Sequence, residues 1–161
     1  MKILVATDGS GYNKTAVEEF ACKPFPADTQ LLVVSAYNHS SLIMSTAAPM
    51  GGLVGYYKQL DSSAKKYGED AVENTAAILR NKNAALSITT HVVKGSPKQV
   101  ILEESGEFGA DLIVVGSHGH GALERFLLGS VSQAIAMHAD CSVLIIRKRA
   151  GIVKNEKDTK A

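Results

Sequence analysis

Short, uninterrupted apolar runs alternate with helical patterns along this chain, and this alternation constrains the fold more than any other feature. Runs rich in Val, Ile and Leu cover residues 2–7, 30–36, 111–116 and 141–147, and residues 87–94 form one further strand. Apolar runs without polar alternation are typical of parallel strands that are covered on both faces. Alternating strands and helices require right-handed βαβ crossovers. We therefore predict a doubly wound α/β fold with a five-stranded parallel sheet.

Four helices are predicted between these strands, because apolar residues recur three or four positions apart and so share one face. The third helix opens with Ser96-Pro97-Lys98-Gln99, a pattern typical of a capping box with proline at the first helical position. The predicted helices cover residues 16–23, 61–79, 96–108 and 129–135.

Residues 37–60 differ from the rest, because they show no clear period and contain Pro49 and three glycines. We predict a long loop here. Asp61 is an acceptable N-cap, so the long second helix is expected to begin there.

Composition fits one globular domain. The chain has 161 residues, of which 45% are hydrophobic and 20% charged, with a net charge of +1. Such a weak charge does not favour nucleic acid or an anionic membrane as the main partner. The first residues lack a secretory signal pattern, and no apolar stretch is long enough to span a membrane. We expect a cytoplasmic protein with one domain over residues 1–148 and a polar, flexible tail at 149–161.

Two loops carry the candidate binding residues, because ligands of open α/β sheets lie at the carboxyl ends of the strands where the strand order reverses. The first loop, residues 7–10, follows the first strand and offers Thr7 and Asp8. The second loop, residues 116–121, follows the fourth strand and offers Gly116, His118 and Gly119. We predict that the two loops face each other.

The start of the last helix, Gly129-Ser130-Val131-Ser132, suits a phosphate group. Backbone N–H groups at a helix N-terminus are unpaired and carry partial positive charge, and glycine lets an anion come close. The hydroxyls of Ser130 and Ser132 are expected to add hydrogen bonds. Asp8 better suits a ribose hydroxyl, or a phosphate-bound divalent ion through water, because a bare carboxylate would repel phosphate.

Other nucleotide motifs are missing. No strand is followed by G-x-x-x-x-G-K-[ST] or by G-x-G-x-x-G, so neither a Walker ATPase nor a NAD dehydrogenase is indicated. A purely structural alternative remains open, in which residues 116–121 only connect a strand to a helix. The paired histidines of this loop are more often solvated than ligands, and no metal site is predicted.

The glycine spacing resembles that of a known family. Gly116, Gly119, Gly129 and Ser130 match the pattern G-x2-G-x9-G-[ST] of ATP-binding universal stress proteins. The resemblance covers nearly the whole chain. It also includes residues 3–10, 95–97 and 141–147.

This resemblance implies the strand order 3-2-1-4-5 and an ATP site that uses magnesium. It places Asp8 near the ribose and adenine, the backbone near Ala36 against the base, and residues 116–132 around the phosphates. It also implies a homodimer in which the last strands pair, through Val143 and Ile145. A long apolar edge strand needs a partner or a cover, although the same residues are also explained as core.

The function expected from these observations is regulatory ATP binding in a stress response, with no catalytic residues assigned. A slow ATPase is an alternative, and its only candidate groups are Asp8, His118, His120 and Glu124. A nucleotide-free interaction scaffold of the same family is a further alternative. A phospho-acceptor receiver domain is disfavoured, because Asp8 has no neighbouring acidic pair to hold a divalent ion.

Overall fold

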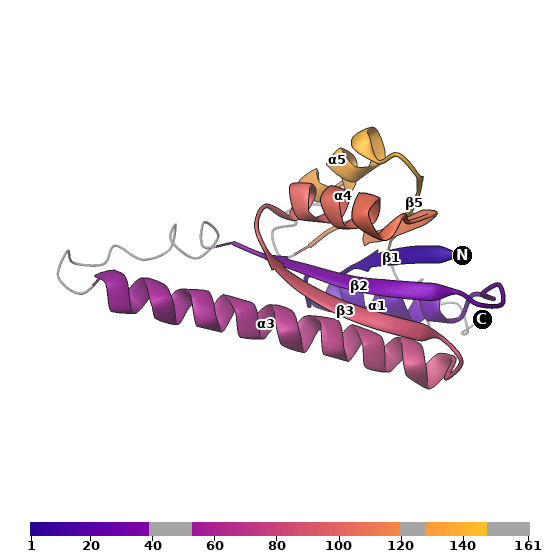
Figure 1. The fold of residues 1–161 in the computed structure, drawn as a ribbon, viewed down its shortest axis with the longest axis horizontal. Helices are drawn as coiled ribbons and strands as arrows, with labels where there is room; N and C mark the ends of the chain where they lie inside the picture. The colour runs from indigo at the N-terminus through magenta and orange to yellow at the C-terminus, as the bar shows by residue number, and fades with distance from the viewer. Residues whose placement is uncertain (39–52, 120–127, 148–161) are drawn as a thin grey trace, which may run out of the picture.

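Five parallel strands form one sheet in the order β3-β2-β1-β4-β5, which is the order that the family resemblance implied (Figure 1). The computed structural model describes residues 1–38, 53–119 and 128–147. The strands are β1 (Lys2–Ala6), β2 (Gln30–Tyr37), β3 (Ser87–Lys94), β4 (Leu112–Gly116) and β5 (Ser142–Ile146). Because the chain winds from β1 through β2 to β3 and then returns to β4, the strand order reverses between β1 and β4.

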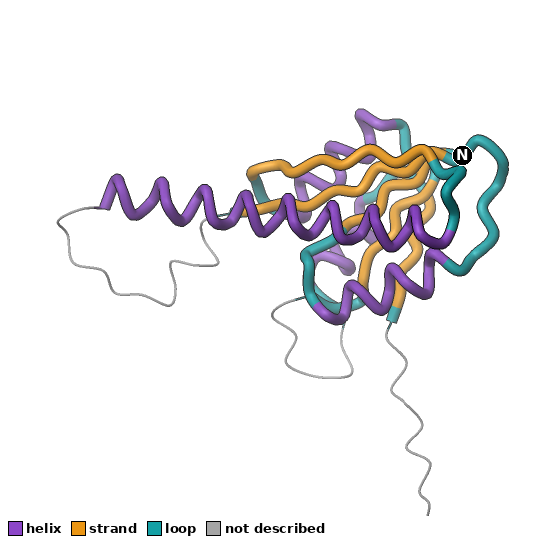
Figure 2. Tube along the Cα trace, turned by 90° about the horizontal axis from the view of Figure 1, so that it is seen from below, coloured by secondary structure: helices purple, strands orange, loops and turns teal. Residues whose placement is uncertain are grey.

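Helices cover both faces of the sheet, which confirms the doubly wound architecture (Figures 1 and 2). Of the helices in the described residues, two pack on one face and two on the other, each pair with its own apolar core. The first pair is α1 (Gly11–Ala21) and α3 (Leu53–Lys82), and the second is α4 (Pro97–Phe108) and α5 (Ser130–His138).

The central strand β1 shows why its run is continuously apolar. Ile3 and Val5 point into the core under α1 and α3, whereas Leu4 and Ala6 point into the core under α4 and α5. All four side chains are buried. A strand with two covered faces has no solvent-facing position, so no polar residue alternates with the apolar ones.

The prediction for residues 37–60 was wrong at both ends. Strand β2 continues to Tyr37, and α3 begins at Leu53, eight residues before Asp61, while residues 39–52 lie outside the described part. Asp61 instead pairs with Lys94 at the end of β3, with 3.0 Å between Oδ1 and Nζ. The first turns of α3 extend past the end of the sheet (Figures 1 and 2). Without a sheet face to pack on, these turns need no apolar period.

Helix α4 begins where the sequence predicted, but not through a capping box. Ser96 is the N-cap residue, yet its side chain makes no capping hydrogen bond. Its carbonyl accepts the first helical bond from the Val100 N–H at 2.9 Å. Pro97 fixes a helical φ at the first position and carries no N–H, so one fewer donor needs a cap.

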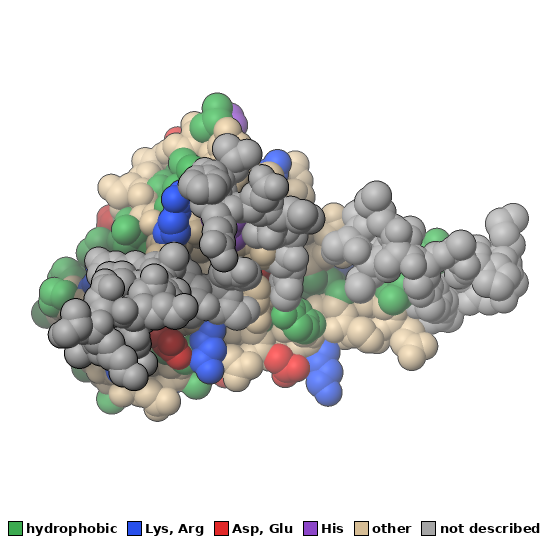
Figure 3. Space-filling model, turned by 180° about the vertical axis from the view of Figure 1, so that it is seen from behind, with side chains coloured by type: hydrophobic (Ala, Val, Ile, Leu, Met, Phe, Trp, Pro, Cys, Tyr) green, Lys and Arg blue, Asp and Glu red, His purple; other side chains and the backbone are tan. Residues whose placement is uncertain are grey.

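Charged side chains of both signs share one face of the molecule. On the face shown in Figure 3, the described basic and acidic side chains lie interspersed. No helix among the described residues is both long and apolar enough to cross a membrane. The tail at 149–161 lies outside the described residues.

Candidate functional site

The two loops predicted to carry the site meet beyond the carboxyl ends of β1 and β4. A Cβ atom added to Gly119 would lie 2.5 Å from Oδ2 of Asp8. The loops meet because β1 and β4 are neighbours, with Val5 beside Val114 in register. Asp8 therefore occupies the space that any side chain at position 119 would need.

The first loop is folded tightly on itself. The Ser10 N–H donates to Asp8 Oδ1 at 3.0 Å, and the Gly9 N–H donates to Thr7 Oγ1 at 3.3 Å. Gly9 has φ +71°, a left-handed conformation that glycine adopts without strain. Thr7 is buried, and its own N–H donates to the carbonyl of Val34 at 2.9 Å. The turn thus aims the Asp8 carboxylate across to the second loop.

The start of α5 is joined to the second loop by two hydrogen bonds. The Gly129 N–H donates to the Ser117 carbonyl at 2.9 Å, and the Ser132 hydroxyl donates to the Gly116 carbonyl at 2.7 Å. The first helical bond runs from the Gln133 N–H to the Gly129 carbonyl. The N–H groups of residues 130–132 therefore have no acceptor inside the helix. The Ser132 hydroxyl proton holds the second loop, so this side chain positions the loop.

His118 has one ring nitrogen with a hydrogen-bond partner and one without a partner in the described part of the chain. Its Nδ1 lies 3.0 Å from Ser117 Oγ. Its Nε2 is buried, and no hydrogen-bond partner for it exists among the described residues. Buried polar atoms are nearly always paired, so we expect the partner of this nitrogen to lie outside the described residues.

Ala36 lies at the same edge of the sheet as the first loop. It stands near the end of β2 and is half-buried, two residues after Val34, the hydrogen-bond partner of Thr7. Val131, in the first turn of α5, is also half-buried and packs on the core under α4 and α5. The predicted residues thus come together from the ends of β1, β2 and β4 and from the start of α5.

Two residues of α3 that the sequence did not single out support the first loop. A Cβ on Gly9 would lie 3.0 Å from the Tyr67 hydroxyl oxygen, and the Thr75 hydroxyl donates to Thr7 Oγ1 at 3.2 Å. Burial, and secondarily the negative charge of Asp8, raise the pKa of Tyr67. No local signal identifies these residues, because they lie far along the chain from the loop.

Only some of the titratable side chains predicted for the site lie in the part of the chain that the structure describes. No cluster of three or more His, Cys, Asp or Glu side chains that would hold a metal occurs among these residues. His120 and Glu124, two of the candidates for hydrolysis, lie outside them. Asp8 and His118 are the titratable side chains from the predicted set that the structure places here.

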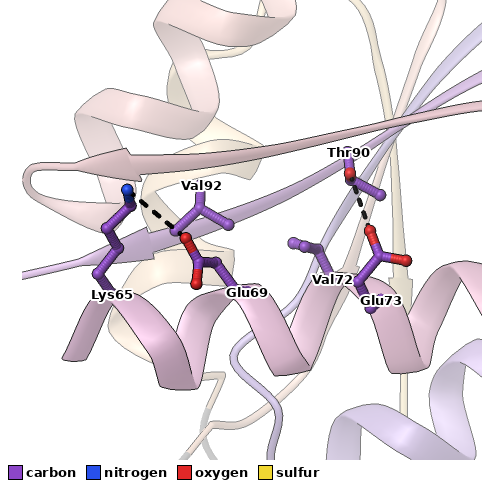
Figure 4. Close-up of a pocket in the computed structure, with 6 residues that line it drawn as sticks. All are labelled: Lys65, Glu69, Val72, Glu73, Thr90 and Val92. Atoms are coloured by element: carbon purple, nitrogen blue, oxygen red, sulfur yellow. Dashed lines mark hydrogen bonds and ion pairs between the residues drawn. The ribbon is translucent and has the colours of Figure 1, made fainter. Parts of the chain in front are cut away.

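A separate hollow of about 270 Å³ lies between α3 and the edge strand β3 (Figure 4). Its polar side chains bond to one another. Lys65 pairs with Glu69 at 3.5 Å, and the Thr90 hydroxyl donates to Glu73 at 3.2 Å. Because these groups satisfy each other, this hollow offers less to a ligand than the facing loops do.

The fold and the facing loops define the class of protein. The chain is a doubly wound α/β protein, in which two loops meet at the switch point of the parallel sheet. The universal stress protein family model matches residues 1–147. The chain belongs to the universal stress protein family.

Individual proteins agree with this assignment. A Staphylococcus epidermidis protein named as a universal stress protein is 31% identical over 146 residues, covering 90% of this chain and 82% of that protein. The structure of universal stress protein UspA from Lactobacillus plantarum has a TM-score of 0.72 and 23% identity, covering 91% and 97% of the two chains. A family member from Arabidopsis thaliana, solved with AMP bound, has a TM-score of 0.66 and 23% identity over 93% of each chain.

Proposed function

We propose that this chain binds an adenine nucleotide, with ATP as the expected ligand, between the loops that follow β1 and β4. The observation that carries the proposal is the close approach of Asp8 to Gly119 beside the open N-terminus of α5. Asp8 supplies a hydrogen-bond acceptor, and the helix start supplies donors. A nucleotide needs both, because ribose hydroxyls donate and phosphates only accept.

The phosphates would be bound by backbone groups. Residues 130–132 offer the N–H groups at the positive end of the α5 dipole, with the exposed Ser130 hydroxyl beside them. Gly129, whose N–H bonds to Ser117, serves to close the turn. Nε2 of His118, which has no hydrogen-bond partner among the described residues, is a further group for the ligand.

The sugar and base would lie toward β1 and β2. Asp8 would accept hydrogen bonds from ribose hydroxyls, while Thr7 holds the turn and the backbone near Ala36 meets the base. The Arabidopsis relative solved with AMP supports an adenine nucleotide as the ligand class. ATP in place of AMP rests on the match of Gly116, Gly119, Gly129 and Ser130 to the pattern of ATP-binding members.

Magnesium fits the proposal only as an ion that is bound to the phosphates of the nucleotide. Mg²⁺ keeps several waters and is often held by one or two carboxylates together with substrate phosphates. Asp8 is the carboxylate in the right place among the described residues. The function proposed is therefore regulatory nucleotide binding in a stress response, located in the cytoplasm as the sequence predicts. Cell fractionation that recovers the protein elsewhere would contradict that location.

The direct test is to denature the purified protein and identify released nucleotide by mass, and to measure ATP and AMP binding by calorimetry. We expect the wild-type protein to bind ATP. A variant with Gly129→Leu and Ser130→Leu should lose it, because bulky side chains block the helix N-terminus. If the protein binds AMP but not ATP, AMP replaces ATP as the proposed ligand. Absence of any adenine nucleotide would leave the interaction scaffold as the better function.

A phosphate-release assay on the same two proteins separates binding from catalysis. If phosphate release from ATP exceeds that of the Gly129→Leu, Ser130→Leu variant, the slow ATPase replaces the purely regulatory function. We expect equal release, because none of the candidate groups in the sequence follows a recognisable general-base pattern.

We also propose a homodimer through β5. Within the described residues β5 pairs only with β4, which leaves its other edge open. Val143 and Ile145 are half-buried against the core of the α4 and α5 face. An apolar edge strand of this kind favours pairing with a second copy. Equilibrium sedimentation at micromolar concentration should give twice the chain mass, and a monomer would refute the dimer.

A further inference from the structure

The first loop is connected to α3 by a short hydrogen-bond relay. The Thr75 hydroxyl donates to Thr7 Oγ1 at 3.2 Å, and the same oxygen accepts the Gly9 N–H at 3.3 Å. Both threonines are buried, with 5% and 7% of their surface exposed. A side chain in the middle of a helix thus reaches the backbone of the loop that carries Asp8.

Core packing alone favours an apolar side chain at position 75 over threonine. It lies on the core-facing stripe of α3, between Val72 and Ala76, where an apolar residue of the same size would avoid burying a hydroxyl. A helical threonine usually bonds back to its own helix. Here the hydroxyl bonds across to the first loop instead, so its use is long-range.

The rest of the support behind the loop is incomplete. A hollow of about 400 Å³ lies between α1 and α3 directly behind it. Thr7, Gly9 and Ser10 form one wall, and α3 forms the other. Across this hollow, the side chains of Tyr67, Ala71 and Thr75 of α3 reach the loop, and the Thr75 hydroxyl donates a hydrogen bond to it.

We propose that Thr75 is a positioning residue for the nucleotide site, and this inference rests on the proposed function. Its hydroxyl fixes Thr7 Oγ1, which fixes the Gly9 N–H and so the turn. That turn holds Asp8 through the Ser10 N–H and directs its other oxygen at Gly119. Without the relay the loop spreads over more conformations, and nucleotide binding must first order it.

Two substitutions separate positioning from stability. Thr75→Val keeps the volume but removes the hydroxyl, so we expect ATP to bind about fivefold more weakly, with a Tm within about 2 °C of wild type. Thr75→Ser keeps the hydroxyl but loses a buried methyl group, so we expect near-normal affinity and a Tm lower by roughly 2–4 °C. Thr90→Val is the matched control, because its hydroxyl bonds to Glu73 and not to the first loop (Figure 4). It should leave affinity unchanged.

A merely structural role predicts the opposite order. The serine variant would then lose more affinity than the valine variant, because it loses more stability, and that result would overturn the proposal. Unchanged ATP affinity in Thr75→Val would overturn it as well.

Amide hydrogen exchange without nucleotide tests the relay independently of the ligand. Thr75→Val should speed exchange at Gly9 and Ser10 at least about threefold, while Thr75→Ser should not. If the wild-type protein binds no adenine nucleotide, the proposed function fails but the relay stands on this exchange result. If exchange is the same in both variants, the relay fails whatever the protein binds.

Discussion

Gly119→Ala is expected to weaken ATP binding by roughly 10- to 100-fold, the loss typical of a displaced charge-assisted contact, while the protein stays folded. The added Cβ would lie 2.5 Å from Oδ2 of Asp8, so the carboxylate must rotate away from its place between the loops. The atom that must move is the end of a short side chain, so the fold absorbs the change. Calorimetric titration with ATP measures the loss, and the thermal midpoint checks the fold.

Two controls make this result specific to Asp8. Gly106→Ala adds the same methyl group where nothing lies within 4 Å, and it should leave affinity unchanged. In an Asp8→Ala background, Gly119→Ala should cost little further affinity, because the two changes remove the same contact. Additive losses in the double variant would show that position 119 acts independently of Asp8.

Ile113→Ala should lower the free energy of unfolding by about 3–5 kcal/mol, because it removes a fully buried side chain and leaves a cavity. Ile113 is 0% exposed and lies at the centre of the sheet, beside Leu4 of β1 and Val143 of β5. The thermal midpoint should fall by about 10 °C for a chain of this size.

The control for this change is Met137→Ala in α5. Met137 is 70% exposed, so its truncation removes little buried surface and should shift the midpoint by less than about 2 °C. For both variants, urea unfolding gives the free energy of unfolding and heating gives the thermal midpoint, each followed by circular dichroism. Equal midpoints would mean that β4 is not in the interior of the sheet.

The geometry of the candidate site was partly predictable, because its residues lie in loops that follow strands. Asp8 and Gly119 come directly after buried runs, and parallel strands end at one edge, so two such loops meet at the point where the order reverses. Gly129 was predictable as a helix start by composition. The use of its N–H by Ser117, and of the Ser132 hydroxyl by Gly116, was not predictable, because hydrogen-bond partners depend on how the chain closes.

The sequence by itself determined the five strands, their helices and the family, since apolar period and glycine spacing are local properties of the chain. It did not determine where α3 begins, because Pro49 and three glycines between residues 37 and 60 favour a loop, and the turns before Asp61 extend past the sheet. Only the tertiary structure placed Thr75 on Thr7, 68 residues away, and Tyr67 against Gly9. Contacts across such separations leave no periodic trace, because they depend on the helix packing that the whole fold imposes.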